Sequence, residues 1–359
     1  MNGNRTNVRE TIGTLLGGCY ASVTSPLHWI AGHIWAVVLT VVLSATASAQ
    51  VQRVMVASFN YDTTDSALKP PMLVAGLSLA FEITKQYAVV PMGVRDSIAA
   101  RIGDSATYQR VADSLKAEII VFCSVARIAN LVRSEIVIAG GDGFTFTTSG
   151  VGYGVTFLKS DSAGGMIYDP AILSSMQRAL CAALRDSNLY SKADEGLRTR
   201  PTSLLSVGGI FFATPPEDYV TWSTFKEKVA ASYDIMQTCV AALRYRNDYT
   251  IIDDVSRDSM YVKDGLYFVE NYNTVTQQEL KILKAFDVSH ILTGRYERIA
   301  DGARLTLYLQ SIEANGSLKT ITSGSEVVPV DSKLALQDGV RACLRKIFGT
   351  ITEQSAPSK

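Results

Sequence analysis

Two stretches of the 359-residue chain decide its fold, Leu115–Phe122 (LKAEIIVF) and Phe286–Leu292 (FDVSHIL). Each carries the end of a helical pattern into a short apolar strand. The first stretch leads to Arg127-Ile128 and the second to Arg298-Ile299. This shared pattern indicates that one structural unit occurs twice in the chain.

Further pairs of segments repeat in the same order: Tyr87–Ile98 with Tyr249–Met260, Thr148–Gly150 with Thr322–Gly324, and Arg178–Cys181 with Arg341–Leu344. The spacing within the pairs drifts by loop-sized steps, and the period is too long for a solenoid, so tandem domains are indicated. We predict one domain over residues 51–189, a polar linker over 190–203, a second domain over 204–348 and a disordered tail over 349–359.

Within one unit, strand and helix patterns alternate and then end in a hairpin and a helix. The predicted elements of the first unit are Val54–Phe59, Met72–Gln86, Tyr87–Val90, Tyr108–Lys116, Ile119–Val125, Leu131–Ala139, Phe144–Phe157 and Pro170–Leu184. This order predicts an α/β (mixed α+β) fold. Each domain has a mixed β-sheet with packed helices and a C-terminal hairpin plus helix.

The amino terminus resembles an export signal. The apolar run Ile34–Leu43 precedes Ala47-Ser48-Ala49, a pattern of small residues that predicts cleavage between Ala49 and Gln50. We therefore expect residues 1–49 to be a signal peptide, and the mature protein to lie in the periplasm or at the outer membrane. Two alternatives remain open. The window Trp29–Ala49 is nearly long enough for an uncleaved inner-membrane anchor. The segment before the apolar run is long and has only Arg5 and Arg9 as basic residues, so a chain that is not exported is the second alternative.

Composition excludes some functions. The chain has 34 Lys and Arg against 34 Asp and Glu, so it lacks the positive charge of a nucleic-acid-binding protein. Four cysteines follow the signal segment, at positions 123, 181, 239 and 343. They lie in apolar strand and helix patterns, which favours buried thiols over disulfides.

The segment Ile291–Tyr296 (ILTGRY), followed by an alternating strand and Asn315-Gly316, resembles the amino-terminal domain of TolB and the related CsgG-like and LpoB-like envelope domains. In the first half Cys123 stands where Gly294 stands in the second. No propeller follows, so the chain departs from TolB itself. The resemblance implies a non-enzymatic, periplasm-facing protein that docks other envelope proteins.

Few residues suggest chemistry. Asp253 and Asp254 follow a strand end, where ligands often bind in α/β folds, and His290 is the one histidine beyond the signal segment. Adjacent residues of an extended chain point to opposite faces, so the two carboxylates make a poor proton-sharing pair. No cysteine and histidine set has zinc spacing, and no phosphate-binding loop is present. We expect no catalytic, cofactor or metal site.

Two other motifs need an explanation. Gly150, Gly152 and Gly154 leave one face of a predicted strand without side chains. Either a helix or the other domain packs flat on this face, or it is an interaction surface for a partner or a second copy. The repeated Arg95–Ser97 and Arg257–Ser259 (both RDS) are interpreted as a surface turn with a helix cap.

The leading hypothesis is therefore a non-enzymatic exported cell-envelope protein that acts as a protein-interaction or assembly module. Its expected partners are other envelope proteins or a second copy, with no nucleic acid. It would touch the membrane only through an uncleaved N-terminal segment. The alternatives are a ligand-binding or hydrolytic enzyme using Asp253, Asp254 and His290, and a membrane-anchored oligomeric structural subunit.

Overall fold

Each half of the chain builds a five-stranded mixed sheet, and the two sheets have the same strand order. The computed structural model describes residues 51–141, 146–156, 170–190, 202–213, 222–244, 246 and 248–349. The expected signal segment with its cleavage site, most of the expected linker and the tail from residue 350 lie outside the described residues. The described residues belong to one compact unit.

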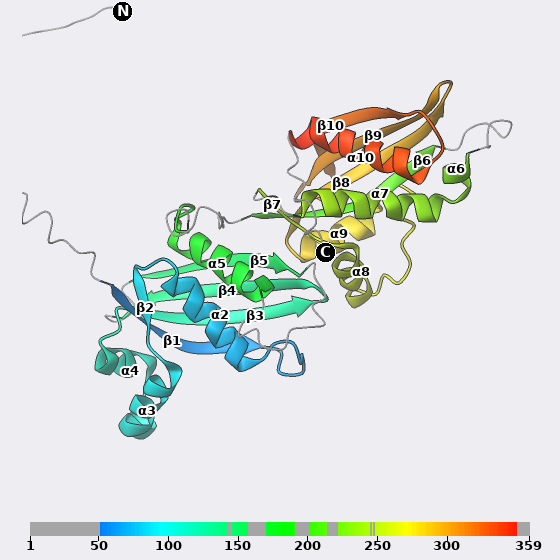
Figure 1. The fold of residues 1–359 in the computed structure, drawn as a ribbon. Coiled ribbons are helices and arrows are strands. Elements are labelled where there is room, and N and C mark those ends of the chain that lie inside the picture. The colour runs from blue at the N-terminus through cyan, green and yellow to red at the C-terminus, as the bar shows by residue number, and fades with distance from the viewer. Residues whose placement is uncertain are drawn as a thin grey trace, which may run out of the picture. The chain divides into compact units, whose positions relative to one another are not determined.

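In the first half the order along the sheet is β2-β1-β3-β4-β5 (Figure 1). Its elements are β1 (Gln52–Tyr61), α2 (Pro70–Glu82), β2 (Tyr87–Val89), α3 (Met92–Ile102), η1 (Gly103–Ser105), α4 (Tyr108–Leu115), β3 (Ile119–Ile128), β4 (Leu131–Gly140), β5 (Thr147–Val155) and α5 (Pro170–Leu184). Strands β1, β2 and β3 are parallel, whereas β3, β4 and β5 are antiparallel.

In the second half the order is β7-β6-β8-β9-β10, with the same pattern of parallel and antiparallel pairs. Its elements are β6 (Ser203–Ala213), α6 (Ser223–Lys226), α7 (Lys228–Leu243), β7 (Tyr249–Ile251), α8 (Asp254–Lys263), α9 (Gln277–Ala285), β8 (Val288–Ile299), β9 (Gly302–Ile312), β10 (Leu318–Val328) and α10 (Lys333–Phe348). The expected mixed fold class is therefore confirmed.

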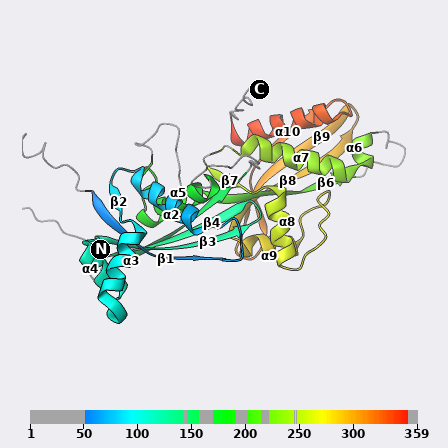
Figure 2. The same ribbon diagram turned by 60° about the horizontal axis from the view of Figure 1, so that its bottom comes forward.

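Helices cover both faces of each sheet in part. In the first half α2 and α5 pack on one face, and α3 and α4 lie on the other beside β1 and β3. In the second half α7 and α10 lie side by side on one face, as Figure 2 shows, while α8 and α9 pack on the other. None of these described helices is both long enough and apolar enough to span a bilayer.

Cys123, Cys181, Cys239 and Cys343 are buried free thiols, as the sequence predicts. Burial raises the pKa of the Cys123 and Cys181 thiols to about 12. Both thiols therefore stay protonated at neutral pH, and they serve as small core side chains.

The glycine stripe is an internal packing surface. A Cβ atom added at Gly150, Gly152 or Gly154 would overlap the backbone of α5. Because the bare face lets α5 lie directly on β5, no free surface remains there. The interaction surface considered for Gly150, Gly152 and Gly154 is therefore wrong, and the packing alternative describes this face.

The repeated Arg-Asp-Ser motifs are also not surface turns. Arg95 lies in α3 and Arg257 in α8. The Arg257 Nη1 donates to the carbonyl of Val207 in β6 at 2.7 Å, and Arg95 Nη1 donates to the carbonyl of Val56 in β1, also at 2.7 Å. Each guanidinium also binds the aspartate that follows it. Both motifs thus tie a helix to the first strand of its sheet, next to a bulge in that strand.

Replacing Gly152 by Val should lower the free energy of unfolding by about 3 kcal/mol, the upper end of the usual overpacking cost, because the obstacle is backbone. Urea denaturation measures this loss. Gly93→Ala is the matched control, since a Cβ at Gly93 meets nothing within 4 Å. An unchanged midpoint for Gly152→Val would contradict the packing described here.

Arg257→Ala should destabilise the fold by about 2–4 kcal/mol, because it leaves the Val207 carbonyl without its donor and opens a cavity. The side chain of Arg257 is only 1% exposed, whereas that of Arg95 is 16% exposed. Water can more readily replace the guanidinium of Arg95, so Arg95→Ala should cost less. Equal thermal shifts for the two variants would contradict this reasoning.

Candidate functional site

The most distinctive surface surrounds residues 264–276, here called the loop segment, which joins α8 to α9. The N–H groups of Ile210 and Phe212 in β6 donate to its Asn271 and Tyr272 carbonyls at 2.9 and 3.3 Å. At its start, the Leu266 N–H donates to the Tyr261 carbonyl at 2.8 Å. These bonds hold the segment along β6 beyond the end of the short strand β7.

A glycine pair in β6 makes room for this arrangement. Strand β6 changes register between Val207 and Ile210, and Gly209 within this bulge has φ +68°. A Cβ atom at Gly209 would overlap Val275 of the loop segment. Glycine is therefore needed here both for the backbone conformation and for the close approach.

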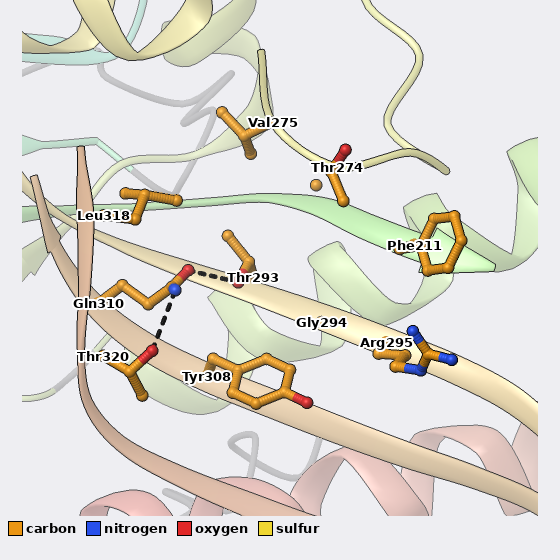
Figure 3. A pocket seen from close by; sticks show the side chains of 11 residues that line it. Phe211, Thr274, Val275, Thr293, Gly294, Arg295, Tyr308, Gln310, Leu318 and Thr320 are labelled. Carbon is orange, nitrogen blue, oxygen red and sulfur yellow. Dashed lines mark hydrogen bonds between the residues drawn. The ribbon is translucent and has the colours of Figure 1, made fainter. Parts of the chain in front are cut away.

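Beside the loop segment, the open face of β6, β8, β9 and β10 carries a groove of about 340 Å³ (Figure 3). Val275 and Leu318 give it an apolar end. Across its floor, Thr293 Oγ1 donates to Gln310 Oε1 at 2.7 Å, and Gln310 Nε2 donates to Thr320 Oγ1 at 3.2 Å. This chain of neutral groups crosses β8, β9 and β10.

The other end of the groove is aromatic and cationic. The Arg295 guanidinium lies 5.4 Å from the centre of the Phe211 ring and donates to Glu297 at 2.9 Å. Because Glu297 partly neutralises Arg295, the groove offers hydrogen bonds and stacking more than net charge. Such a surface suits an extended or polar ligand bound through neutral contacts.

A second recess, of about 220 Å³, lies at the other end of the loop segment. Asn271 lines it, and its buried Oδ1 has no hydrogen-bond partner among the described residues. Burial raises the pKa of Tyr261, which also lines the recess, so its phenol stays protonated. Tyr267 and Phe268 also line the recess, and they are 69% and 91% exposed.

The residues considered for catalysis are occupied in other ways. Asp253 is the N-cap of α8: its Oδ1 accepts from the Ser256 N–H, and its Oδ2 accepts from Asn130 Nδ2 at 2.6 Å. Its neighbour Asp254 stands in the first turn of the same helix, where a negative charge is favourable. Asp253 therefore stabilises a helix start.

His290 contacts two neighbours. Its Nδ1 lies 2.8 Å from the Ser289 hydroxyl, and its ring meets the edge of Tyr249 at 5.1 Å. Burial, and then the charge of Lys284, lower the pKa of His290 below its ordinary value of 6.5. Among the described residues, no hydrogen bond or ion pair joins His290 to either aspartate. Across the part of the chain that the structure describes, no three His, Cys, Asp or Glu side chains gather where they could hold a metal ion.

The loop segment is not predicted above, although the sequence carries a signal for it. Between the matched segments, the second half has a turn, Asp264-Gly265, followed by the apolar run Leu266–Val269. The first half has no such run between Ile98 and Ala117. Aligning the two repeats residue by residue would have marked this insertion as the place where the halves differ.

Comparison with known proteins adds structural likenesses. No protein-family model and no curated protein sequence matches the chain. Among solved structures, lipoprotein GNA1162 from Neisseria meningitidis is similar, with 12% identity, TM-score 0.26, and coverage of 31% of this chain and 86% of its own. The LpoB C-terminal domain from Salmonella enterica has 17% identity, TM-score 0.26, and coverage of 33% and 92%.

TolB from Acinetobacter baumannii has 7% identity, TM-score 0.23, and coverage of 40% of this chain and 28% of its own. Structures of LpoB and TolB are thus among these partial likenesses.

His290→Ala should leave the protein folded and lower the free energy of unfolding by about 1 kcal/mol, through loss of the aromatic contact with Tyr249. The pKa of His290 is depressed in the folded state, so the unfolded state binds its proton more readily. Stability should therefore fall as the pH drops below 6.5 towards the lower folded pKa. The variant should lack this part of the pH dependence. Urea denaturation of both proteins at about pH 7.5 and pH 5.5 tests this. An equal loss of unfolding free energy in both proteins between the two pH values would contradict it.

Proposed function

We propose that this protein is a non-enzymatic, exported cell-envelope protein that acts as a protein-interaction or assembly module. Residues 51–189 and 204–348 would be two copies of one domain, joined by the linker at 190–203. The export signal at 1–49 would place it in the periplasm or at the outer membrane. Its partners would be other envelope proteins or a second copy of the chain.

The observation that carries this proposal is the exposure of Phe268. A phenylalanine side chain that is 91% exposed gains nothing for the fold, because burial is what makes an aromatic ring stabilising. Its loop segment is held to β6 by the amides of Ile210 and Phe212 and is therefore not a loose tip. A rigidly presented aromatic side chain is typical of an anchor in a protein interface.

The surroundings of Phe268 also fit a protein partner. Tyr267 is exposed beside it, and Val262 of α8, 49% exposed, extends the apolar surface. The orphan Asn271 Oδ1 in the adjoining recess could accept a hydrogen bond from the partner, which would remove the cost of leaving it unpaired. Apolar anchors around a recess with a polar acceptor make a common binding surface.

Phe268→Ala should weaken binding to the partner about 30-fold while changing the free energy of unfolding by less than about 0.5 kcal/mol. Crosslinking in the native host, followed by mass spectrometry, identifies the partner, and binding of the purified pair gives the affinity. Val229→Ala is the matched control, because Val229 on α7 is also exposed, at 56%, but lies outside the recess. Sedimentation shows whether the partner is a second copy. Undiminished binding by Phe268→Ala would contradict the proposed role of the loop segment.

A further inference from the structure

The first strands of the two sheets are equivalent position by position around their bulges. Val207 of β6 corresponds to Val56 of β1, because both carbonyls accept from the arginine of the repeated motif. The register shifts just beyond each residue. Ala57 is unmatched in β1, and Gly208 and Gly209 stand opposite the single residue Thr293 in β6, so each first strand has one residue more than its partner. After the bulge, Ile210 and Phe212 therefore correspond to Phe59 and Tyr61.

These equivalent residues differ in their hydrogen bonds. In the second half the N–H groups of Ile210 and Phe212 point away from β8 and donate to Asn271 and Tyr272. Backbone groups alternate in direction along a strand, so the N–H groups of Phe59 and Tyr61 lie on one side of β1. Their equivalence to Ile210 and Phe212 places that side away from β3. Among the described residues, no backbone acceptor outside the sheet pairs with either amide. Strand β2 cannot supply one, because its pairing with β1 ends at Val54.

The difference follows from the length of one connection. In the second half the loop segment between α8 and α9 has thirteen residues, 264–276, and reaches back along β6. In the first half only the five residues 103–107 lie between α3 and α4. Three of them form the 3₁₀ turn Gly103–Ser105. This short connection leads from α3 directly into α4, and among the described residues it makes no hydrogen bond to the outer edge of β1.

The side chains beside this edge suit an apolar contact. Phe59 and Tyr61 are only partly buried and pack at the margin of the core formed with α2 and α5. In the second half Tyr272 of the loop segment occupies the corresponding margin, packed against the core formed with α7 and α10. The segment that covers the edge of β6 therefore supplies two carbonyls and one aromatic side chain.

We propose that the outer edge of β1 at Phe59–Tyr61 docks an extended peptide segment of a partner protein. The segment accepts hydrogen bonds from the Phe59 and Tyr61 amides through two carbonyls and lays an aromatic side chain against the two rings. The peptide would contact β1 in the way that residues 271–272 of the loop segment contact β6. Such strand addition draws its affinity from main-chain bonds and its selectivity from the side chain. This docking edge lies on the first half and is independent of Phe268.

The test uses the protein from residue 51 onward and a synthetic peptide with the sequence of Val269–Val275 (VENYNTV) as the probe. Hydrogen exchange is followed at single amides by NMR. In the free protein the amides of Phe59 and Tyr61 should exchange faster than those of Ile210 and Phe212. With about 1 mM peptide, exchange at Phe59 and Tyr61 should slow about threefold. Protection elsewhere without these two amides, or no protection, would overturn the proposal.

Two variants at one position isolate the amide. Tyr61→Ala keeps the N–H and removes the ring, whereas Tyr61→Pro removes both. Proline is tolerated where the N–H faces away from the sheet. Tyr61→Pro should bind the peptide about tenfold more weakly than Tyr61→Ala, and equal binding would overturn the proposal. If Tyr61→Pro does not fold, the exchange pattern of the unchanged protein decides alone.

Phe268→Ala separates this inference from the proposed function. In that variant the peptide should still protect the Phe59 and Tyr61 amides, even where binding of the envelope partner is lost. If Phe268→Ala lost both the peptide protection and the binding of the envelope partner, the docking edge would not be independent of Phe268. That result would overturn the claim of independence.

Discussion

The structure depends on how β1 and β6, the first strands of the two sheets, form backbone hydrogen bonds beyond the ends of the short strands β2 and β7. Strands β2 and β7 have only three residues each, so they pair with β1 and β6 over a few positions. Beyond them, backbone groups that are removed from water need other partners. Arg95 and Arg257 supply donors to the carbonyls at the bulges, and in the second half the loop segment supplies acceptors to the amides. The position of a helix, a buried arginine and a loop all follow from this one requirement.

Much of the architecture could be predicted from the sequence, because most elements carry an apolar pattern that matches their period. The strands β3 and β8 and the closing helices α5 and α10 belong to this group. Helix α3 was missed because it buries no residue and so has no apolar stripe. Helix α8 was missed for a different reason: its buried residues include Ser256 and Arg257, which no hydrophobic pattern marks as core.

The roles of single residues were harder to predict, because they depend on which element arrives from a distance. In the sequence, the bare face of the glycine stripe on β5 fits either a packed helix or a partner protein. In the structure the backbone of α5 occupies this face, which excludes a partner there. Asp253 after a strand resembles a ligand-binding carboxylate, yet the Ser256 N–H and Asn130 bind both of its oxygens. Phe268 stands in an apolar run that predicts burial, and only the fold shows it to be exposed.

The two halves therefore differ at the same place in the same topology. In the second half, the longer connection covers the strand edge and, in doing so, carries Tyr267 and Phe268 outwards. In the first half the shorter connection presents no such aromatic pair, and among the described residues it supplies no acceptor to the amides of Phe59 and Tyr61. The edge of β6, which the loop segment covers, presents side chains for contact with another chain. The corresponding edge of β1 presents main-chain N–H groups. A single change in loop length thus gives one topology two different means of contacting other chains. Because uncovered edges also invite unwanted pairing, an open edge retained on β1 is better explained by a docking role than by the needs of the fold.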